Sequence, residues 1–197
     1  MVVICGNTVA TLCNYTFGAV TTDPKGEVYM KNAQNVGSQF PKITSTEFSW
    51  YITGFVDGEG YFSIDFVKRE KMRSGLEIRP SFSIGQNRKS LDVLKLIQNY
   101  FGCGAIRFSK KDQLYKYEVR SIKDLKTKII PHFKKYPLQT SKQNDFLKFE
   151  YICDLISSSK HLNKEYLEEI IKLAYTMNSS GKHKYTYEDL LRIVKLR

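Results

Sequence analysis

The chain has 197 residues, a formal net charge of +11, 42% hydrophobic residues and 26% charged residues, an ordinary globular mixture that can bury a core. Its length suits one domain, or one domain with an extension. No stretch approaches the roughly 18 consecutive apolar residues of a membrane span, and no basic, apolar leader opens the chain. Four dispersed cysteines and three histidines lack zinc-site spacing, so we expect an intracellular protein with reduced thiols.

The positive charge is concentrated in one block. Residues 61–145 hold 19 basic and 8 acidic residues, a net charge of +11, whereas residues 1–48 are neutral and residues 49–60 carry −2. Lys and Arg that neutralise phosphates release condensed counterions, so nucleic acid is the favoured partner. A solvated basic surface is the alternative, and a membrane surface is less favoured because no basic amphipathic helix is visible.

Residues 1–43 contain Gly, Thr, Asn and Asp-Pro without periodicity, and we interpret them as an N-terminal extension ahead of one domain, 44–197. The sequence TSTE at 44–47 is a capping box, in which Thr44 and Glu47 satisfy donors at a helix N-terminus. A helix of about three turns is then expected through FSWYITGFVDGEG, ending at its glycines.

The next segments alternate with the period of two of half-buried strands. In YFSIDFV, Phe62, Ile64 and Phe66 lie on one face. The partner segment LEIRPSFSIG, 76–85, has a similar apolar face, and the basic loop between the two segments predicts a hairpin.

A second helix–strand–strand–helix series follows. Ser90 can cap a helix that Gly102 closes, short strands are expected at 105–108 and 115–120, and helical periodicity resumes at 122–133, where Pro131 disturbs it. Further helices are expected at 141–157, 163–177 and 186–197. The order α-β-β-α-β-β-α predicts an α+β fold in which helices cover one face of a four-stranded antiparallel sheet. The polar, basic face is left for solvent or for the DNA major groove, which admits a β-ribbon.

The first helix combines glycines with acids. Gly54 and Gly58 are four residues apart on one face, and each costs roughly 1 kcal/mol relative to Ala, which close approach of a second helix would explain. Asp57 and Glu59 stand at the helix C-terminus, where a carboxylate is electrostatically unfavourable unless a divalent cation binds it. Two copies meeting about a twofold axis would bring two Glu59 side chains together, which requires metal ions or protons. The alternative is a turn with solvated acids.

The segment ITGFVDGEG resembles the LAGLIDADG motif of a homing endonuclease family, with matches at Gly54, Asp57 and Gly60. The element order over residues 44–157 and the segment PLQTSKQNDF are also similar to that family. Members with one motif act as homodimers that pack their motif helices together and straddle double-stranded DNA. The resemblance therefore implies a homodimer with Gly54, Phe55 and Gly58 at the interface.

The resemblance also implies roles for site residues. Glu59 and the Gly58 carbonyl match the metal-binding positions, and Gln86 matches a polar position that orders water around the metals. Lys142 lies where the family has a basic residue near the scissile phosphate, with Lys134 and Lys135 as rivals. Asp57 matches an acid that supports the helix ends.

The outward strand positions coincide with the family's base-reading face, and Val67 among them is apolar and could contact a thymine methyl group. These positions are Ser63, Asp65, Val67, Arg69, Glu77, Arg79, Ser81, Ser83, Arg107, Ser109, Lys116, Glu118 and Arg120. The tail after about residue 160 contains a packing stripe of Leu162, Tyr166, Ile170, Leu173 and Met177. Lys182, His183 and Lys184 are candidates for phosphate contacts at the flank of the site.

The resemblance implies an intron-encoded, site-specific endonuclease that cuts both strands of a long pseudo-palindromic DNA target with Mg²⁺, a site that Mn²⁺ or Ca²⁺ can also occupy. Two alternatives on the same scaffold are an RNA-binding maturase and a DNA-binding protein that has lost cleavage. The Lys-rich, Asn- and Tyr-bearing composition favours a mitochondrial or plastid gene, with bacterial and archaeal hosts as further options.

Overall fold

The computed structural model describes residues 20–22, 28–30, 44–178 and 184–196. Two short strands, β1 (Val20–Thr22) and β2 (Val28–Met30), pair antiparallel. The rest of the expected N-terminal extension lies outside the described residues, as do Lys182 and His183, so these interpretations stay predictions.

Helix α2 (Ser45–Glu59) begins at the predicted capping box. The Thr44 hydroxyl accepts a hydrogen bond from the Glu47 amide at 3.2 Å, and the Glu47 carboxylate accepts one from the Thr44 amide at 2.7 Å. The helix has 15 residues, which make about four turns, one turn more than expected. It ends because Gly60 turns into an extended conformation and starts the first strand of the main sheet.

The main sheet is antiparallel, in the order β3-β4-β6-β5, and confirms the predicted fold class. Strands β3 (Gly60–Lys68) and β4 (Leu76–Asn87) form the predicted hairpin, and β4 extends two residues beyond the expected end. Pro80 is tolerated inside β4 because β6 pairs only with residues 82–87, so the missing N–H of Pro80 removes no ladder bond on that side. Strands β5 (Ala105–Ser109) and β6 (Leu114–Val119) form the second hairpin.

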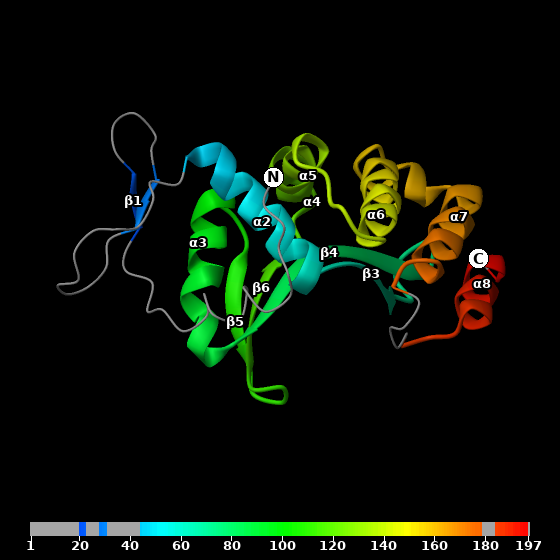
Figure 1. Cartoon of the computed structure of the whole chain (residues 1–197). Coiled ribbons are helices and arrows are strands. Elements are labelled where there is room, and N and C mark those ends of the chain that lie inside the picture. The colour runs from blue at the N-terminus through cyan, green and yellow to red at the C-terminus, as the bar shows by residue number, and fades with distance from the viewer. Residues whose placement is uncertain (1–19, 23–27, 31–43, 179–183, 197) are drawn as a thin grey trace.

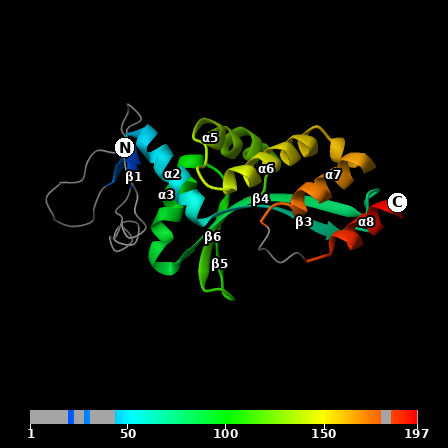
Figure 2. The ribbon, with the colours of Figure 1, turned by 45° about the vertical axis from the view of Figure 1, so that its right-hand side comes forward.

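One face of the sheet is covered by helices and the other is open. Figures 1 and 2 show α2, α5 and α6 above the sheet, with α7 and α8 toward the end where β3 and β4 run. Phe62 and Phe82, paired across the β3–β4 hairpin, point into the helix layer and pack with Phe133 at ring distances of 5.5 and 5.6 Å. Burial of such aromatic side chains supplies most of the stabilisation of the layer contact.

One local prediction needs correction, and a second is confirmed. Ser90 makes no side-chain cap on α3 (Leu91–Phe101), because a 3-10 turn (Arg88–Ser90) precedes that helix and the Asn87 side chain caps this turn. Gly102 does close α3 in the left-handed conformation. The disturbance expected near Pro131 is confirmed: the helical segment is divided into α4 (Ile122–Asp124), a π-helical stretch (Leu125–Ile129) and α5 (Ile130–Lys135), and the wider turn accommodates the residue that lacks a donor.

The C-terminal helices are confirmed as α6 (Lys142–Ser157), α7 (Lys164–Tyr175) and α8 (Tyr187–Lys195), with a 3-10 turn (Lys160–Leu162) before α7. Side chains of Asn163 and Thr186 cap α7 and α8. Most of the predicted α7 stripe is buried or partly buried, but Leu162 is exposed. No helix among the described residues is long and apolar enough to cross a membrane.

A buried polar network fixes the inner face of α2. The ring of His132, on α5, lies 3.2 Å from the Thr53 hydroxyl and 2.9 Å from the Tyr100 hydroxyl, and Tyr100 lies 2.8 Å from the Ser49 hydroxyl. Burial lowers the pKa of His132 to about 4, so the imidazole is neutral at pH 7. The network therefore joins α2, α3 and α5 through uncharged groups.

This network makes stability depend on pH. The unfolded histidine titrates near 6.5 and the folded one at about 4, so the unfolded state binds the extra proton as the pH falls. Stability should decrease between about pH 6.5 and 4, by at most about 3 kcal/mol from this group. Urea unfolding of His132→Gln should show a flatter pH dependence over this range than that of the wild type. A wild-type stability that is constant between pH 6.5 and 5 would contradict the neutral buried ring.

Candidate active site at the end of the motif helix

The C-terminal end of α2 is tied to the segment that precedes α6. The Asp57 carboxylate accepts hydrogen bonds from the Gln139 amide at 2.7 Å, the Thr140 amide at 3.3 Å and the Thr140 hydroxyl at 2.7 Å. Three donors compensate the unfavourable position of an acid at a helix C-terminus. Asp57 is thus occupied by protein groups, in agreement with a supporting role.

Lys142, the first residue of α6, reaches the same helix end. Its ammonium group donates to the Val56 carbonyl at 2.8 Å, which places a cation at the negative end of the α2 dipole. Burial lowers the pKa of Lys142, while the nearby charges of Asp57 and Glu59 act in the opposite direction. An electropositive, partly buried amine therefore stands beside the two acids of the motif.

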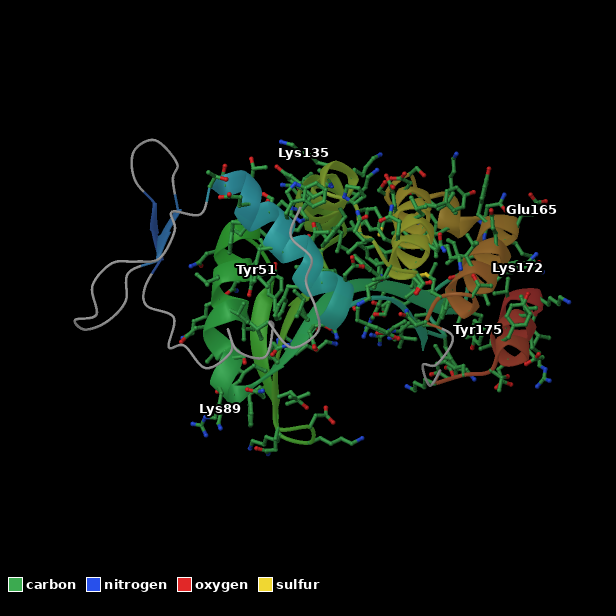
Figure 3. The ribbon with its side chains drawn as sticks, viewed as in Figure 1. Tyr51, Lys89, Lys135, Glu165, Lys172 and Tyr175 are labelled. Atoms are coloured by element: carbon green, nitrogen blue, oxygen red, sulfur yellow. The ribbon has the colours of Figure 1, made fainter. Side chains whose placement is uncertain are left out.

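The rival lysines have other surroundings. Lys134 forms an ion pair with Glu150 at 2.8 Å, and the Lys135 ammonium lies over the Tyr136 ring at 5.3 Å from its centre. Figure 3 places Lys135 on the outer side of the helix layer, away from the sheet. Of the three candidates, only Lys142 is brought to the motif acids.

Glu59 is the last residue of α2 and is exposed. Among the described residues no hydrogen bond to its carboxylate occurs, and no cluster of three or more His, Cys, Asp or Glu could hold a metal ion. One chain therefore supplies an uncommitted carboxylate, with the Gly58 carbonyl next to it, but not a complete ligand set. That donor set suits a hard divalent cation whose remaining ligands come from elsewhere.

The glycines of the motif serve different purposes. A Cβ on Gly60 would lie 2.8 Å from the Val56 carbonyl oxygen, so only glycine allows the helix to pass directly into β3. A Cβ on Gly54 or Gly58 would meet nothing within 4 Å. Among the residues that the structure describes, nothing covers this face of α2, which leaves room for another helix backbone.

Large apolar side chains flank this open face. Trp50 and Tyr51 are exposed, and Tyr51 stacks on Phe55, which is itself half-buried. Figure 3 shows Tyr51 on the surface of α2. An exposed aromatic patch beside a flat glycine surface is typical of a protein–protein interface.

Gln86 lies near the end of β4, at the same end of the sheet as Glu59, because Ile84 is paired with Gly60. It is partly exposed and sits opposite Tyr115 of β6. The register places Gln86 near the end of α2, but no hydrogen bond joins the side chains of Gln86 and Glu59.

The predicted base-reading positions share the open face of the sheet, as the strand pairing requires. Ser63 faces Ser81, Asp65 faces Arg79, and Arg107 faces Lys116. Ser81 and Ser83 are exceptions to the expected exposure, with 1% and 3% accessible. Their side chains are short, lie on a central strand, and in the case of Ser81 bond to the Ser63 hydroxyl at 2.8 Å, so neighbouring side chains cover them.

Sequence reasoning gave no role to Gln139 and Thr140, although both hold Asp57. The partners are 82 and 83 residues apart, and no spacing or periodicity signals such a contact. Asn178 was missed for the same reason: its side-chain amide donates to the Phe62 carbonyl at 2.7 Å on the edge strand β3.

An acid-ended, glycine-faced helix lying on a sheet with an open basic face defines the class of the LAGLIDADG proteins. The family model described as LAGLIDADG endonuclease matches residues 52–153. The chain belongs to this family.

Relatives and solved structures agree with this assignment. An uncharacterised 50.9 kDa protein in ND4 intron 1 of Podospora anserina is 43% identical over 122 residues, 61% of this chain and 27% of that protein. The archaeal intron-encoded homing endonuclease I-Vdi141I, solved in complex with DNA, matches with a TM-score of 0.70 and 29% identity over 76% of this chain and 95% of that one. The meganuclease I-SmaMI, bound to uncleavable DNA, matches with a TM-score of 0.67 and 31% identity, over 75% of this chain but only 48% of that chain.

The chain spans about a quarter of the length of the first fungal relatives that it matches.

The role of Asp57 can be tested by substitution. Asp57→Ala removes the acceptor for three donors and should cost about 1 to 2 kcal/mol of unfolding free energy. It should also accelerate hydrogen exchange at the Gln139 and Thr140 amides. Asp92→Ala, which breaks an exposed ion pair with Lys95 on α3, should cost under about 0.5 kcal/mol and leave these amides protected. Equal exchange at both amides in wild type and Asp57→Ala would show that the carboxylate does not hold the segment.

Proposed function

We propose that this chain is an intron-encoded homing endonuclease that cuts both strands of a long, pseudo-palindromic DNA site by metal-dependent phosphodiester hydrolysis. One observation carries the proposal: an uncommitted glutamate at the end of the motif helix lies beside a partly buried lysine, above a sheet whose basic face is open. Membership of the LAGLIDADG endonuclease family supports the reaction class. The intron origin of the Podospora relative and the name of I-Vdi141I support the biological setting.

The active form is a homodimer. The chain contains one motif and corresponds to nearly all of I-Vdi141I but to about half of I-SmaMI. The open face around Gly54 and Gly58, with Phe55 beside it, is available for the same face of a second copy. A twofold axis through this face gives two DNA-facing sheets, which explains why a dimer would read two related half-sites.

Glu59 and the Gly58 carbonyl of each copy hold the catalytic cation, which we infer to be Mg²⁺. Oxygen ligands of this kind also accommodate Mn²⁺ and Ca²⁺. The incomplete ligand set of one chain fits a site that two copies and the DNA phosphates complete. When bound there, a divalent ion lowers the pKa of water and stabilises the leaving oxygen.

Two further side chains assist the reaction. Lys142, fixed against the Val56 carbonyl, neutralises charge that develops on the scissile phosphate. Gln86 orients water at the same end of the sheet through its amide. The open face of the sheet enters the major groove, and its basic residues neutralise phosphates. The ends of the two motif helices lie between the two sheets of the dimer, and cleavage falls across the minor groove near the centre of the site.

Substitution of Glu59 is the central test. Glu59→Gln keeps the shape but removes the charge that binds the cation, so cleavage with Mg²⁺ should fall at least about a thousandfold, a loss of several kcal/mol of transition-state stabilisation. Specific binding should stay within a few fold. The substrate is a randomised-site DNA library, and the readouts are sequenced broken ends and selection of bound DNA.

Matched outcomes separate the alternatives. Glu165→Gln, an exposed acid in the first turn of α7 (Figure 3), should cut like the wild type. Cleavage by Glu59→Gln at the wild-type rate would refute the catalytic assignment. A wild-type chain that selects a sequence but never cuts it would indicate a DNA-binding protein without cleavage, and selection of RNA alone would indicate a maturase.

The dimer can be tested through Gly54. Gly54→Leu adds no clash within one chain and replaces a poor helix former, so the fold of the single chain should be unaffected or stabilised by up to about 1 kcal/mol. The added side chain should nevertheless separate the paired helices and give a monomer by light scattering. Lys172→Leu, at an exposed position of α7, should remain dimeric. An unchanged dimer of Gly54→Leu would exclude this face as the interface.

A further inference from the structure

Three carboxylates, those of Asp65, Glu77 and Glu118, lie on the open face of the sheet, where DNA phosphates would repel them, and two of them are bound by arginines. Glu77 is on β4 and Glu118 on β6, and the strand register puts both on the face that carries Arg79. Exposed ion pairs add little stability, so stability alone does not account for acids at these positions. Their contacts indicate a different purpose.

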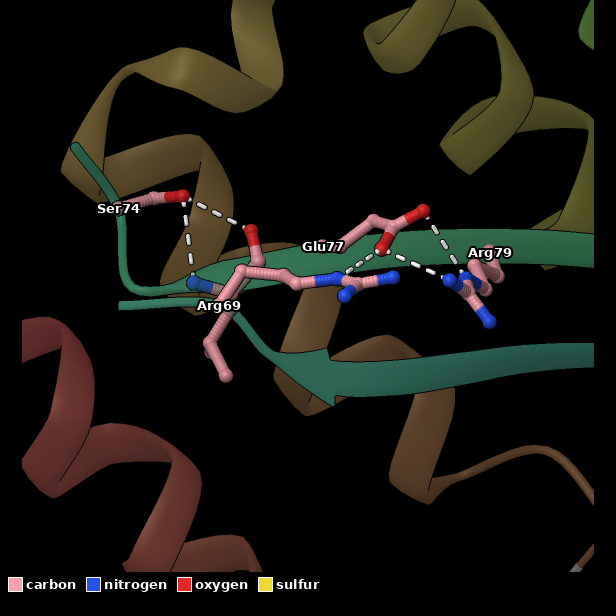
Figure 4. A network of polar contacts seen from close by, with 5 residues as sticks. Arg69, Ser74, Glu77 and Arg79 are labelled. Atoms are coloured by element: carbon pink, nitrogen blue, oxygen red, sulfur yellow. Dashed lines mark hydrogen bonds and ion pairs between the residues drawn. The ribbon is translucent and has the colours of Figure 1, made fainter. Parts of the chain in front are cut away.

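The Glu77 carboxylate accepts hydrogen bonds from two arginines, Arg69 and Arg79 (Figure 4). Arg79, two residues away on the same face, donates from Nε to Oε1 at 2.9 Å and from Nη2 to Oε2 at 2.9 Å. Arg69 donates from Nε to Oε2 at 2.8 Å. Hydrogen bonds from Arg79 and Arg69 lower the pKa of Glu77 to about 2, so the carboxylate is ionised throughout the physiological range.

The Glu118 carboxylate repeats this arrangement on β6. Arg120, two residues away, lies with Nε 2.9 Å from Oε2 and Nη2 3.1 Å from Oε1, and the Lys116 ammonium lies 3.0 Å from Oε1. The Glu118 side chain is 11% exposed, whereas that of Arg120 is 54% exposed. The cations thus cover most of Glu118, whereas the Glu77 side chain stays 33% exposed, and each cluster has a net charge of +1.

The hydrogen bonds to the two glutamates leave one edge of the guanidinium group of Arg79 and of Arg120 free. Glu77 and Glu118 occupy the Nε–Nη2 edge of their arginines, and no hydrogen bond in the described part of the chain uses Nη1 of Arg79 or Arg120. The remaining Nη1–Nη2 edge presents two parallel N–H groups, the geometry that matches O6 and N7 of guanine in the major groove. Both arginines and Asp65 line a groove of about 340 Å³ that is bordered on its other side by the C-terminal part of the chain, including Lys184 and Leu190.

We propose that Glu77 and Glu118 are positioning residues that hold Arg79 and Arg120 for bidentate recognition of guanine, and that the two acids do not read bases themselves. The inference rests on the proposed binding of DNA to this sheet. An arginine held in advance loses less side-chain freedom when it meets a base, and its fixed plane discriminates better between guanine and other bases. Each half-site should therefore contain a guanine for Arg79 and another for Arg120.

The test uses the full chain with Ca²⁺ and a randomised DNA library, from which bound sequences are selected. Arg79→Ala should abolish one guanine preference per half-site. Glu77→Ala should weaken the preference at the same position about tenfold, because the arginine loses its fixed plane. Binding to unrelated DNA should stay equal or become tighter, since a negative charge has been removed.

Three further variants separate positioning from direct contact. In the Arg79→Ala background, Glu77→Ala should change nothing more at that position. Glu77→Gln keeps one oxygen acceptor for the Arg79 guanidinium and should retain an intermediate preference for guanine. Glu118→Ala should affect the guanine read by Arg120 and leave the one read by Arg79 intact. Thermal unfolding followed by circular dichroism checks that each variant is folded.

The outcomes are distinct. A wild-type chain that selects no sequence would overturn both the proposed function and this inference. A guanine preference that depends on Arg79 but is unchanged in Glu77→Ala and Glu77→Gln would overturn the inference alone. A loss in Glu77→Ala that persists without Arg79, especially at a cytosine, would show that the acid reads a base directly.

Discussion

The architecture depends on how α2 accommodates two carboxylates at the end of a helix, where the backbone carbonyls already concentrate negative charge. Asp57 is satisfied by donors from the segment before α6, and Lys142 from the same segment binds the Val56 carbonyl. These contacts join parts of the chain more than 80 residues apart. They leave Glu59 as the acid with its charge still available, at a place fixed relative to Lys142.

The open face of the sheet, which we propose to bind DNA, also places carboxylates where negative charge is unfavourable. A surface that attracts DNA needs excess positive charge, yet mobile lysines and arginines contribute mainly sequence-independent attraction. Carboxylates interleaved with cations reduce the net charge but fix the direction of the arginines that remain exposed. The Glu77 and Glu118 clusters lie on two adjacent strands with the same two-residue spacing between acid and arginine, which is the spacing that a strand places on one face.

Much of the fold could be predicted because its signals are local. The capping box, the alternation in β3 and the glycine that ends α3 each depend on neighbouring residues. The exposure of Ser81 and Ser83 could not be predicted, because it depends on which strand lies in the middle of the sheet. The family resemblance singled out Lys142 among three lysines, but only the tertiary contacts show why it differs from Lys134. The Asp57 contacts have no signal in spacing or periodicity, and the family similarity of the segment PLQTSKQNDF does not say which residue it contacts.

The three sides of α2 differ in how strongly their contacts fix the position of the helix. Its apolar side chains, such as Ile52 and Val56, would allow the helix to slide or rotate slightly on the sheet, since dispersion contacts are not directional. The hydrogen bonds of Ser49 and Thr53 to groups on α3 and α5 are directional and sit one turn apart, so they fix both rotation and axial position. On the opposite side, Gly54 and Gly58 carry no side chain, and Tyr51 and Phe55 lie beside them. Within one chain, the position of Glu59 is therefore set by the polar network beneath the helix and, at the helix end, by the segment that holds Asp57.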